Sequence, residues 1–201
     1  MVKAITVYCS SSKSLASVYY DAGRELGRAI AENGWKLVYG GNNIGLMGVL
    51  ADAVRDGGGK VVGITPKLFC DKGLDDKACD ELVVTDGMRD RKAILEERGD
   101  AFIAMPGGLG TFEEIFEIIV GKQLGFHNKP IVLLNIDGYW SPLLELIDRA
   151  IEQNFIKPKA RELFYVTSTV ADAITHLRTY SPPRASHEWF PHADELPSAA
   201  E

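Results

Sequence analysis

Short apolar runs alternate along the chain with stretches of helical periodicity. Seven of these runs predict strands, over residues 5–8, 36–39, 61–65, 82–85, 101–105, 131–135 and 164–167. Because the runs are continuous and do not alternate with polar residues, they indicate strands that are buried on both faces of a sheet.

Helical patterns fill most of the intervals between these strands. The spacing predicts helices over residues 15–32, 46–55, 89–98, 112–123, 142–153 and 170–177, and Gly34 suits the end of the first one. Residues 67–80 form a polar connection of uncertain shape. Strands that alternate with helices favour a parallel sheet with right-handed crossovers. The predicted fold class is therefore α/β, a doubly wound sheet of about seven strands with helices on both faces.

The chain has 201 residues, which suits one domain. We expect a single folded domain over residues 1–180, followed by a tail over 181–201. The tail shows no periodicity and is rich in proline, with Pro182, Pro183, Pro191 and Pro197.

Composition and charge exclude several classes of protein. Apolar residues make up 46% and charged residues 25%, and the net charge of −6 argues against a nucleic-acid partner. No apolar run has the length of a membrane span, and the apolar start of the chain is too short for a signal peptide. The three cysteines, an odd number without a CxxC pair, fit a reducing compartment. We therefore expect a cytoplasmic protein with no membrane partner.

Unusual residues follow four of the predicted strands, at 10–12, 40–48, 87–92 and 106–114. In a doubly wound sheet, ligands bind beyond the carboxyl ends of the strands. This clustering is the first sign of a functional site.

The segment from Pro106 to Glu114 reads PGGLGTFEE and lies between a strand and a helix. Glycines allow close approach to a ligand, and the first turn of a helix favours an anion, so Gly108, Gly110 and Thr111 suit a phosphate. The alternative is a tight turn without a ligand. The segment is not the glycine fingerprint of a dinucleotide-binding site, because Glu113 stands where the third glycine of that pattern belongs.

Two charged residues have both a functional and a structural interpretation. Glu114 is a candidate catalytic acid, but with Thr111 it also forms a capping-box pattern. Arg91 has no acidic neighbour three or four residues away on its helix and lies along the apolar face, so it needs an anion such as Glu114 or a ligand. The alternative for Arg91 is a structural ion pair with a distant carboxylate. Lys92 has Glu96 four residues on.

The glycine-rich turn over residues 40–48 suits approach to a flat ring or a sugar, although Gly45 and Gly48 are more structural than ligating. The four histidines form no constellation, two of them (His187 and His192) being in the tail, so no metal site is expected.

Together these residues resemble the LOG (Lonely Guy) family of phosphoribohydrolases, often labelled "lysine decarboxylase-like". The family's PGGxGTxxE signature matches residues 106–114, its Met-x-x-Arg-Lys element matches 88–92, and its GG…GxMG element matches 40–48. The resemblance extends over residues 5–177. It implies a Rossmann-like fold, a homodimer, and hydrolysis of cytokinin nucleoside 5′-monophosphates and AMP to free base and ribose 5-phosphate.

The family's catalytic residues fall on Arg91 and Glu114. The candidate substrate-binding residues, taken from the glycine loop and the other strand ends, are Ser10, Gly41, Met88, Lys92, Gly107, Gly108, Leu109, Gly110 and Thr111. We expect no cofactor, because the chain has no convincing pyridoxal-phosphate lysine motif. The sequence leaves open whether Glu114 stabilises the ribosyl cation, holds the ribose hydroxyls or orients water. Two alternative functions remain open. One is a carrier of the same fold that binds a nucleotide or cofactor without turnover, and the other is a regulatory or scaffolding protein whose glycine turns are purely architectural.

Overall fold

The computed structural model describes residues 2–182 and contains one sheet of seven parallel strands. The strand order is β4-β3-β2-β1-β5-β6-β7. The strands are β1 (Ala4–Tyr8), β2 (Lys36–Tyr39), β3 (Lys60–Pro66), β4 (Glu81–Thr85), β5 (Ala101–Ala104), β6 (Ile131–Leu134) and β7 (Tyr165–Thr167). The predicted strands and the doubly wound arrangement are thus confirmed.

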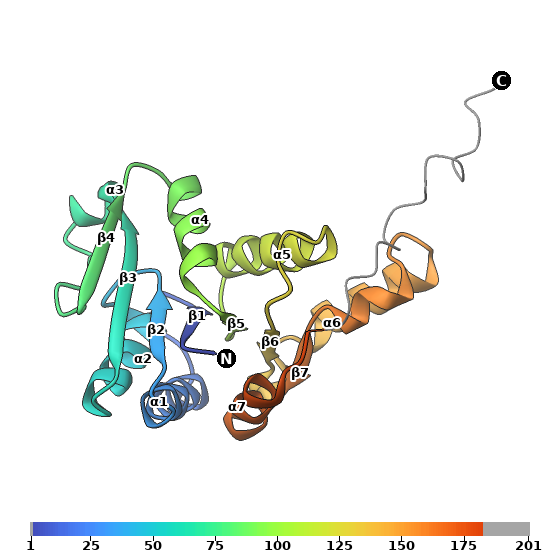
Figure 1. Cartoon of the computed structure of the whole chain (residues 1–201), viewed down its shortest axis with the longest axis horizontal. Coiled ribbons are helices and arrows are strands. Elements are labelled where there is room, and N and C mark those ends of the chain that lie inside the picture. The colour runs from blue at the N-terminus through green and yellow to red at the C-terminus, as the bar shows by residue number, and fades with distance from the viewer. Residues whose placement is uncertain (1, 183–201) are drawn as a thin grey trace.

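Helices cover both faces of this sheet, as Figure 1 shows. They are α1 (Ser17–Glu32), α2 (Gly45–Asp56), α3 (Lys67–Cys70), α4 (Met88–Arg98), α5 (Leu109–Gln123), α6 (Ser141–Glu152) and α7 (Val170–Thr179), with short 3-10 helices η1 (Ile136–Gly138) and η2 (Pro158–Glu162). The polar connection at 67–80 thus contains a short helix. Within residues 2–182, no helix is both long and apolar enough to cross a membrane.

The core consists of two layers, one on each face of the sheet. One layer packs the strands against α1, α2 and α7, and the other packs them against α4, α5 and α6. Successive strand residues point to opposite faces, so Ile5 and Val7 join the first layer and Tyr8 joins the second. Both faces are therefore apolar, which explains the continuous apolar runs in the sequence.

The direction in which strands are added reverses at β1. The chain builds outward from β1 through β2 and β3 to β4, and then returns to place β5 on the other side of β1. In doubly wound sheets such a switch point opens a crevice beyond the carboxyl ends of the two central strands. Residues that follow β1 and β5 are therefore placed to meet a ligand.

Candidate active site

Arg91 lies in the first turns of α4 and is only 6% exposed. Its Nε donates to the carbonyl oxygen of Ile64 at 3.0 Å, and its Nη2 donates to that of Gly40 at 3.4 Å. The guanidinium is thus held across the ends of β2 and β3. The prediction that Arg91 points inward is confirmed.

The anion that Arg91 needs is Glu114, on α5. Nη1 of Arg91 lies 2.8 Å from Oε1 of Glu114, and the glutamate is 9% exposed. Burial raises the pKa of Glu114 above its ordinary value, although the charge and hydrogen bond of Arg91 act in the opposite direction. A buried carboxyl whose pKa is shifted by burial beside a specific charged partner marks a candidate functional site.

The capping-box interpretation of Thr111 and Glu114 is wrong. Helix α5 begins at Leu109 with Gly108 as its N-cap, three residues earlier than predicted, and no side chain caps it. Thr111 lies buried inside the first turn, and Glu114 bonds to Arg91. The carboxyl of Glu114 is therefore available for chemistry rather than committed to the end of its own helix.

The glycine turn before α5 has a packed side and an open side. A Cβ atom at Gly107 would overlap Oγ1 of Thr111, whereas one at Gly108 or Gly110 would meet no heavy atom within 4 Å. Gly108, Leu109 and Gly110 are all exposed. The first backbone N–H groups of a helix have no partner within that helix. The open side of this turn can therefore receive an anion.

The other predicted binding residues are found in several environments. Met88 begins α4 and is 41% exposed. Oγ of Ser10 accepts a hydrogen bond from the backbone of Ser12 at 3.0 Å. Gly41 has a φ of +69° and closes the turn after β2. These three residues are at the ends of β1 and β2 and at the start of α4, on the same edge as the Arg91–Glu114 pair.

Lys92 bonds to different carboxylates from the one that helical spacing suggests. Its Nζ lies 2.7 Å from Oε1 of Glu113 and 2.7 Å from Oε2 of Glu117, both on α5. These two carboxylates, rather than that of Glu96, are its partners. The two adjacent residues Arg91 and Lys92 thus tie α4 to α5 through ion pairs. A direct contact of Lys92 with a nucleotide stays a prediction.

Gly45 and Gly48 are structural, as predicted. A Cβ atom at Gly45 would overlap the backbone oxygens of the serine loop at residues 11–12, and one at Gly48 would lie 2.6 Å from the carbonyl oxygen of Asn43. The glycines of the 40–48 turn therefore let it fold back on itself and pack against the loop after β1.

Two supports of the site have no local signal in the sequence. The hydroxyl of Tyr139 donates to the carbonyl oxygen of Gly107, 32 residues away. The backbone N–H of Asp76 donates to the carbonyl oxygen of Gly41 at 2.8 Å, and its carboxylate accepts from Tyr39 at 2.6 Å and Arg55 at 2.9 Å. Both supports link segments far apart in the chain.

In the described part of the chain, no three His, Cys, Asp or Glu side chains are grouped so that they can hold a metal ion. His127 bonds to the carbonyl oxygen of Ile118 at 2.9 Å, and His176 stacks on Tyr165. His187 and His192 lie outside the described residues, as does most of the predicted tail.

Replacing Gly40 with alanine is expected to displace Arg91. The added methyl group would overlap Nη2 of Arg91 and lie 2.6 Å from Cε of Met47. We expect a loss of about 1–3 kcal/mol in the free energy of unfolding, and a fall in any activity that depends on Arg91. Urea titration and a turnover assay measure the two effects. Gly121→Ala is the control, because its methyl group makes only ordinary contacts, with His127 at 3.4 Å and with Oε1 of Glu96 at 4.0 Å. Equal activity of both variants would contradict the prediction.

Comparisons with known proteins agree on one family. The family model described as "Possible lysine decarboxylase" matches residues 47–177. The cytokinin riboside 5′-monophosphate phosphoribohydrolase LOG3 of Arabidopsis thaliana is 44% identical over 90% of this chain and 84% of its own. The probable cytokinin riboside 5′-monophosphate phosphoribohydrolase LOGL2 of Oryza sativa subsp. japonica is 42% identical over 90% of this chain and 74% of its own.

Solved structures with the same fold are more distant in sequence. The molybdenum cofactor binding protein of Rippkaea orientalis has a TM-score of 0.67 at 23% identity, covering 89% of this chain and 97% of its own. The molybdenum cofactor carrier protein of Chlamydomonas reinhardtii has a TM-score of 0.66 at 24% identity, covering 89% and 97%. At such identities they show the Rossmann-like fold alone. Taken with the relatives above and the paired Arg91 and Glu114, the family match means that this chain belongs to the LOG family of cytokinin riboside 5′-monophosphate phosphoribohydrolases.

Proposed function

We propose that this protein is a phosphoribohydrolase that cleaves the N-glycosidic bond of cytokinin nucleoside 5′-monophosphates, and of AMP, to give the free base and ribose 5-phosphate. The observation that carries the proposal is the buried pair of Arg91 and Glu114 beside an open glycine turn. The names of relatives that are 42–44% identical support it.

Breaking the bond between the base and C1′ develops positive charge on the ribose and negative charge on the departing base. Water supplies the oxygen that adds to C1′, and the bonding electrons leave with the base, which takes up a proton. Glycosidases meet the same oxocarbenium problem with carboxylates. Glu114 supplies the carboxylate that faces the ribosyl cation, and its burial strengthens that electrostatic interaction.

Arg91 and the glycine turn supply the rest of the site. Arg91 orients Glu114 through their ion pair and stabilises charge on the leaving base. The exposed amides of Gly108, Leu109 and Gly110, with Thr111 beneath them, hold the 5′-phosphate. Binding energy from this remote group positions the sugar for reaction. Met88, Ser10 and Gly41 are placed to contact the base and ribose.

One assay separates this function from that of a carrier. The purified protein is incubated with AMP and, in parallel, with isopentenyladenosine 5′-monophosphate, and free base is measured by chromatography. The proposal requires release of base in step with ribose 5-phosphate. A carrier would bind the nucleotide and release no base, and that result would overturn the proposal. The two parallel rates also show which base is preferred.

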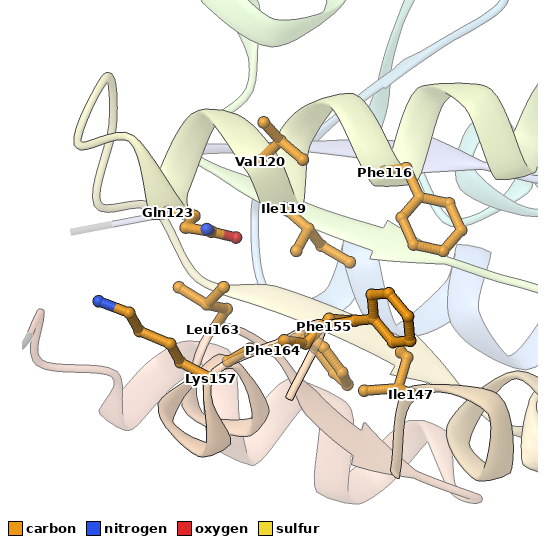
Figure 2. A pocket seen from close by; sticks show the side chains of 11 residues that line it. Phe116, Ile119, Val120, Gln123, Ile147, Phe155, Lys157, Leu163 and Phe164 are labelled. Carbon is orange, nitrogen blue, oxygen red and sulfur yellow. The ribbon is translucent and has the colours of Figure 1, made fainter. Parts of the chain in front are cut away.

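We also infer a homodimer, which the family resemblance implies. Large apolar side chains are exposed along one face of α5, at Leu109 (84%), Phe116 and Val120, and beside it at Phe155 (85%). Figure 2 shows Phe116 and Phe155 on either side of a groove of about 410 Å³ that is lined mainly by apolar residues. Exposed apolar patches of this kind mark interfaces, and the occupant that we propose is a second copy of this chain.

Placing a charge in that groove is expected to separate the subunits. Phe155→Glu puts a carboxylate where an apolar contact is required, at a residue too exposed to support the core. Light scattering after gel filtration is expected to give the mass of a dimer for the unaltered protein and of a monomer for the variant. A monomeric unaltered protein, or a dimeric variant, would exclude this surface.

A cytoplasmic location belongs to the same proposal. The three cysteines are free thiols in the described residues, which fits a reducing compartment. Cell fractionation tests it. The net charge of −6 gives no reason to propose a nucleic-acid partner.

A further inference from the structure

The carbonyl group of Gly107 is held by a side chain from another part of the chain. Tyr139 follows η1, between β6 and α6, and its hydroxyl donates a hydrogen bond to this oxygen. Gly107 is buried, whereas Gly108, the next residue, is exposed. The bond therefore reaches the glycine turn from its packed side and leaves the open side free.

Tyr139 is itself firmly placed. The side chain of Asn135 accepts a hydrogen bond from the backbone of Trp140 at 2.6 Å, and the buried indole of Trp140 donates to the carbonyl oxygen of Ala104 at 3.3 Å. The ring of Tyr139 packs edge-on against Trp140 and against Tyr19 of α1. The segment is thus fixed to the end of β5, the strand that leads into the glycine turn.

Holding the oxygen of Gly107 also fixes the N–H group of Gly108. The two groups belong to one planar trans peptide unit, in which C=O and N–H point in opposite directions. With the oxygen turned toward Tyr139, the amide hydrogen is turned away from it, and a Cβ atom at Gly108 would meet nothing within 4 Å. The hydroxyl therefore sets the direction of the first amide of the open turn.

We propose that Tyr139 is a positioning residue for the phosphate-binding turn, because its hydroxyl holds the peptide unit between Gly107 and Gly108 in the orientation that presents an amide to the substrate phosphate. The inference rests on the proposed function, since it takes the phosphate of a nucleoside 5′-monophosphate, or of ribose 5-phosphate, as the ligand of that turn. In this role Tyr139 does not itself touch the ligand.

The test is Tyr139→Phe, which removes the hydroxyl and keeps the ring. We expect the KM for AMP to rise about fivefold with kcat changed less than twofold, because a single uncharged hydrogen bond that orients a binding group is lost. The Kd of ribose 5-phosphate, measured by calorimetry, is expected to rise by the same factor. Inhibition by adenine, which lacks a phosphate, is expected to stay unchanged.

Tyr180→Phe is the matched control. Its hydroxyl also donates to a backbone carbonyl, that of Asn128 at 3.2 Å, but far from the glycine turn. Thermal unfolding of both variants shows whether the two losses of stability are alike. A role in folding alone would lower stability and leave the KM for AMP and the Kd of ribose 5-phosphate unchanged.

The outcomes separate this inference from the proposed function. If the unaltered protein binds ribose 5-phosphate but releases no base, the proposed function fails and the ratio of Kd values still decides the role of Tyr139. If Tyr139→Phe binds ribose 5-phosphate as tightly as the unaltered protein does, or if the latter does not bind it at all, the inference is overturned. An equal loss of affinity for adenine overturns it as well.

Discussion

Replacing Glu114 with glutamine is expected to lower the rate of base release from AMP by about three orders of magnitude. Glutamine keeps the size of the side chain and its place beside Arg91, but it carries no negative charge to face the ribosyl cation. The amide oxygen of glutamine can still accept the hydrogen bond of Arg91, and no capping bond depends on Glu114, so the variant is expected to fold. Its stability is expected to be lower, because Arg91 loses its anion. Chromatography of the released adenine measures the effect, and circular dichroism confirms the fold.

The matched control is Glu113→Gln, one residue earlier on α5. The side chain of Glu113 is 59% exposed and pairs with Lys92, which keeps Glu117 as a second partner. The rate of base release by Glu113→Gln is expected to differ less than threefold from that of the unaltered protein, because exposed ion pairs contribute little energy. If Glu114→Gln is as active as this control, Glu114 is not the catalytic carboxylate.

The pH dependence of the reaction gives a second measurement of the same role. Glu114 acts as a carboxylate, so kcat/KM falls as the pH drops through its pKa in the free enzyme. Burial raises this pKa, and so does Glu113, while Arg91 and Lys92 lower it. On balance it lies above the ordinary value, so the fall begins at a higher pH than for an exposed glutamate. The residual rate of Glu114→Gln is expected to lack this dependence.

Replacing Arg91 with alanine is expected to lower both activity and stability. The rate of base release should fall about a thousandfold, because the variant loses the buried guanidinium that stabilises charge on the leaving base. The substitution also leaves Glu114 buried without its cation, and removing one partner of a buried pair costs about 3–5 kcal/mol. The turnover assay and urea titration measure the two losses.

A double variant separates the two effects of Arg91. Arg91→Met with Glu114→Gln removes both charges and is expected to regain much of the stability that Arg91→Ala loses, without regaining activity. If the double variant releases adenine at the rate of the unaltered protein, the pair is only structural. That result would return Arg91 to the structural ion pair that its sequence pattern also allowed.

Much of the fold follows from local patterns in the sequence. Each of the five inner strands packs both faces in the core, so continuous apolar runs such as 101–105 are enough to identify it. The inward direction of Arg91 also follows from local spacing, because no acidic residue lies on its side of α4. Its partner Glu114 was one of two candidate anions, and only the packing of α4 against α5 decides between them.

Other features depend on contacts between distant segments and leave no local signal. Thr111 has the side chain of a typical N-cap, but it packs over Gly107, so α5 begins earlier than the pattern indicates. Lys92 has an acidic residue at helical spacing, yet carboxylates from α5 lie closer. The role of Tyr139 depends on how the segment after β6 folds back against β5, which no short pattern reveals.

The hydrogen bonds of Arg91 also limit what a substrate can gain from it. A guanidinium has five N–H donors, and three of those in Arg91 go to Ile64, Gly40 and Glu114. One donor remains on each terminal nitrogen. A nucleotide can therefore accept two hydrogen bonds from Arg91 without displacing the three that hold the guanidinium in place. A third acceptor atom would have to replace one of those three.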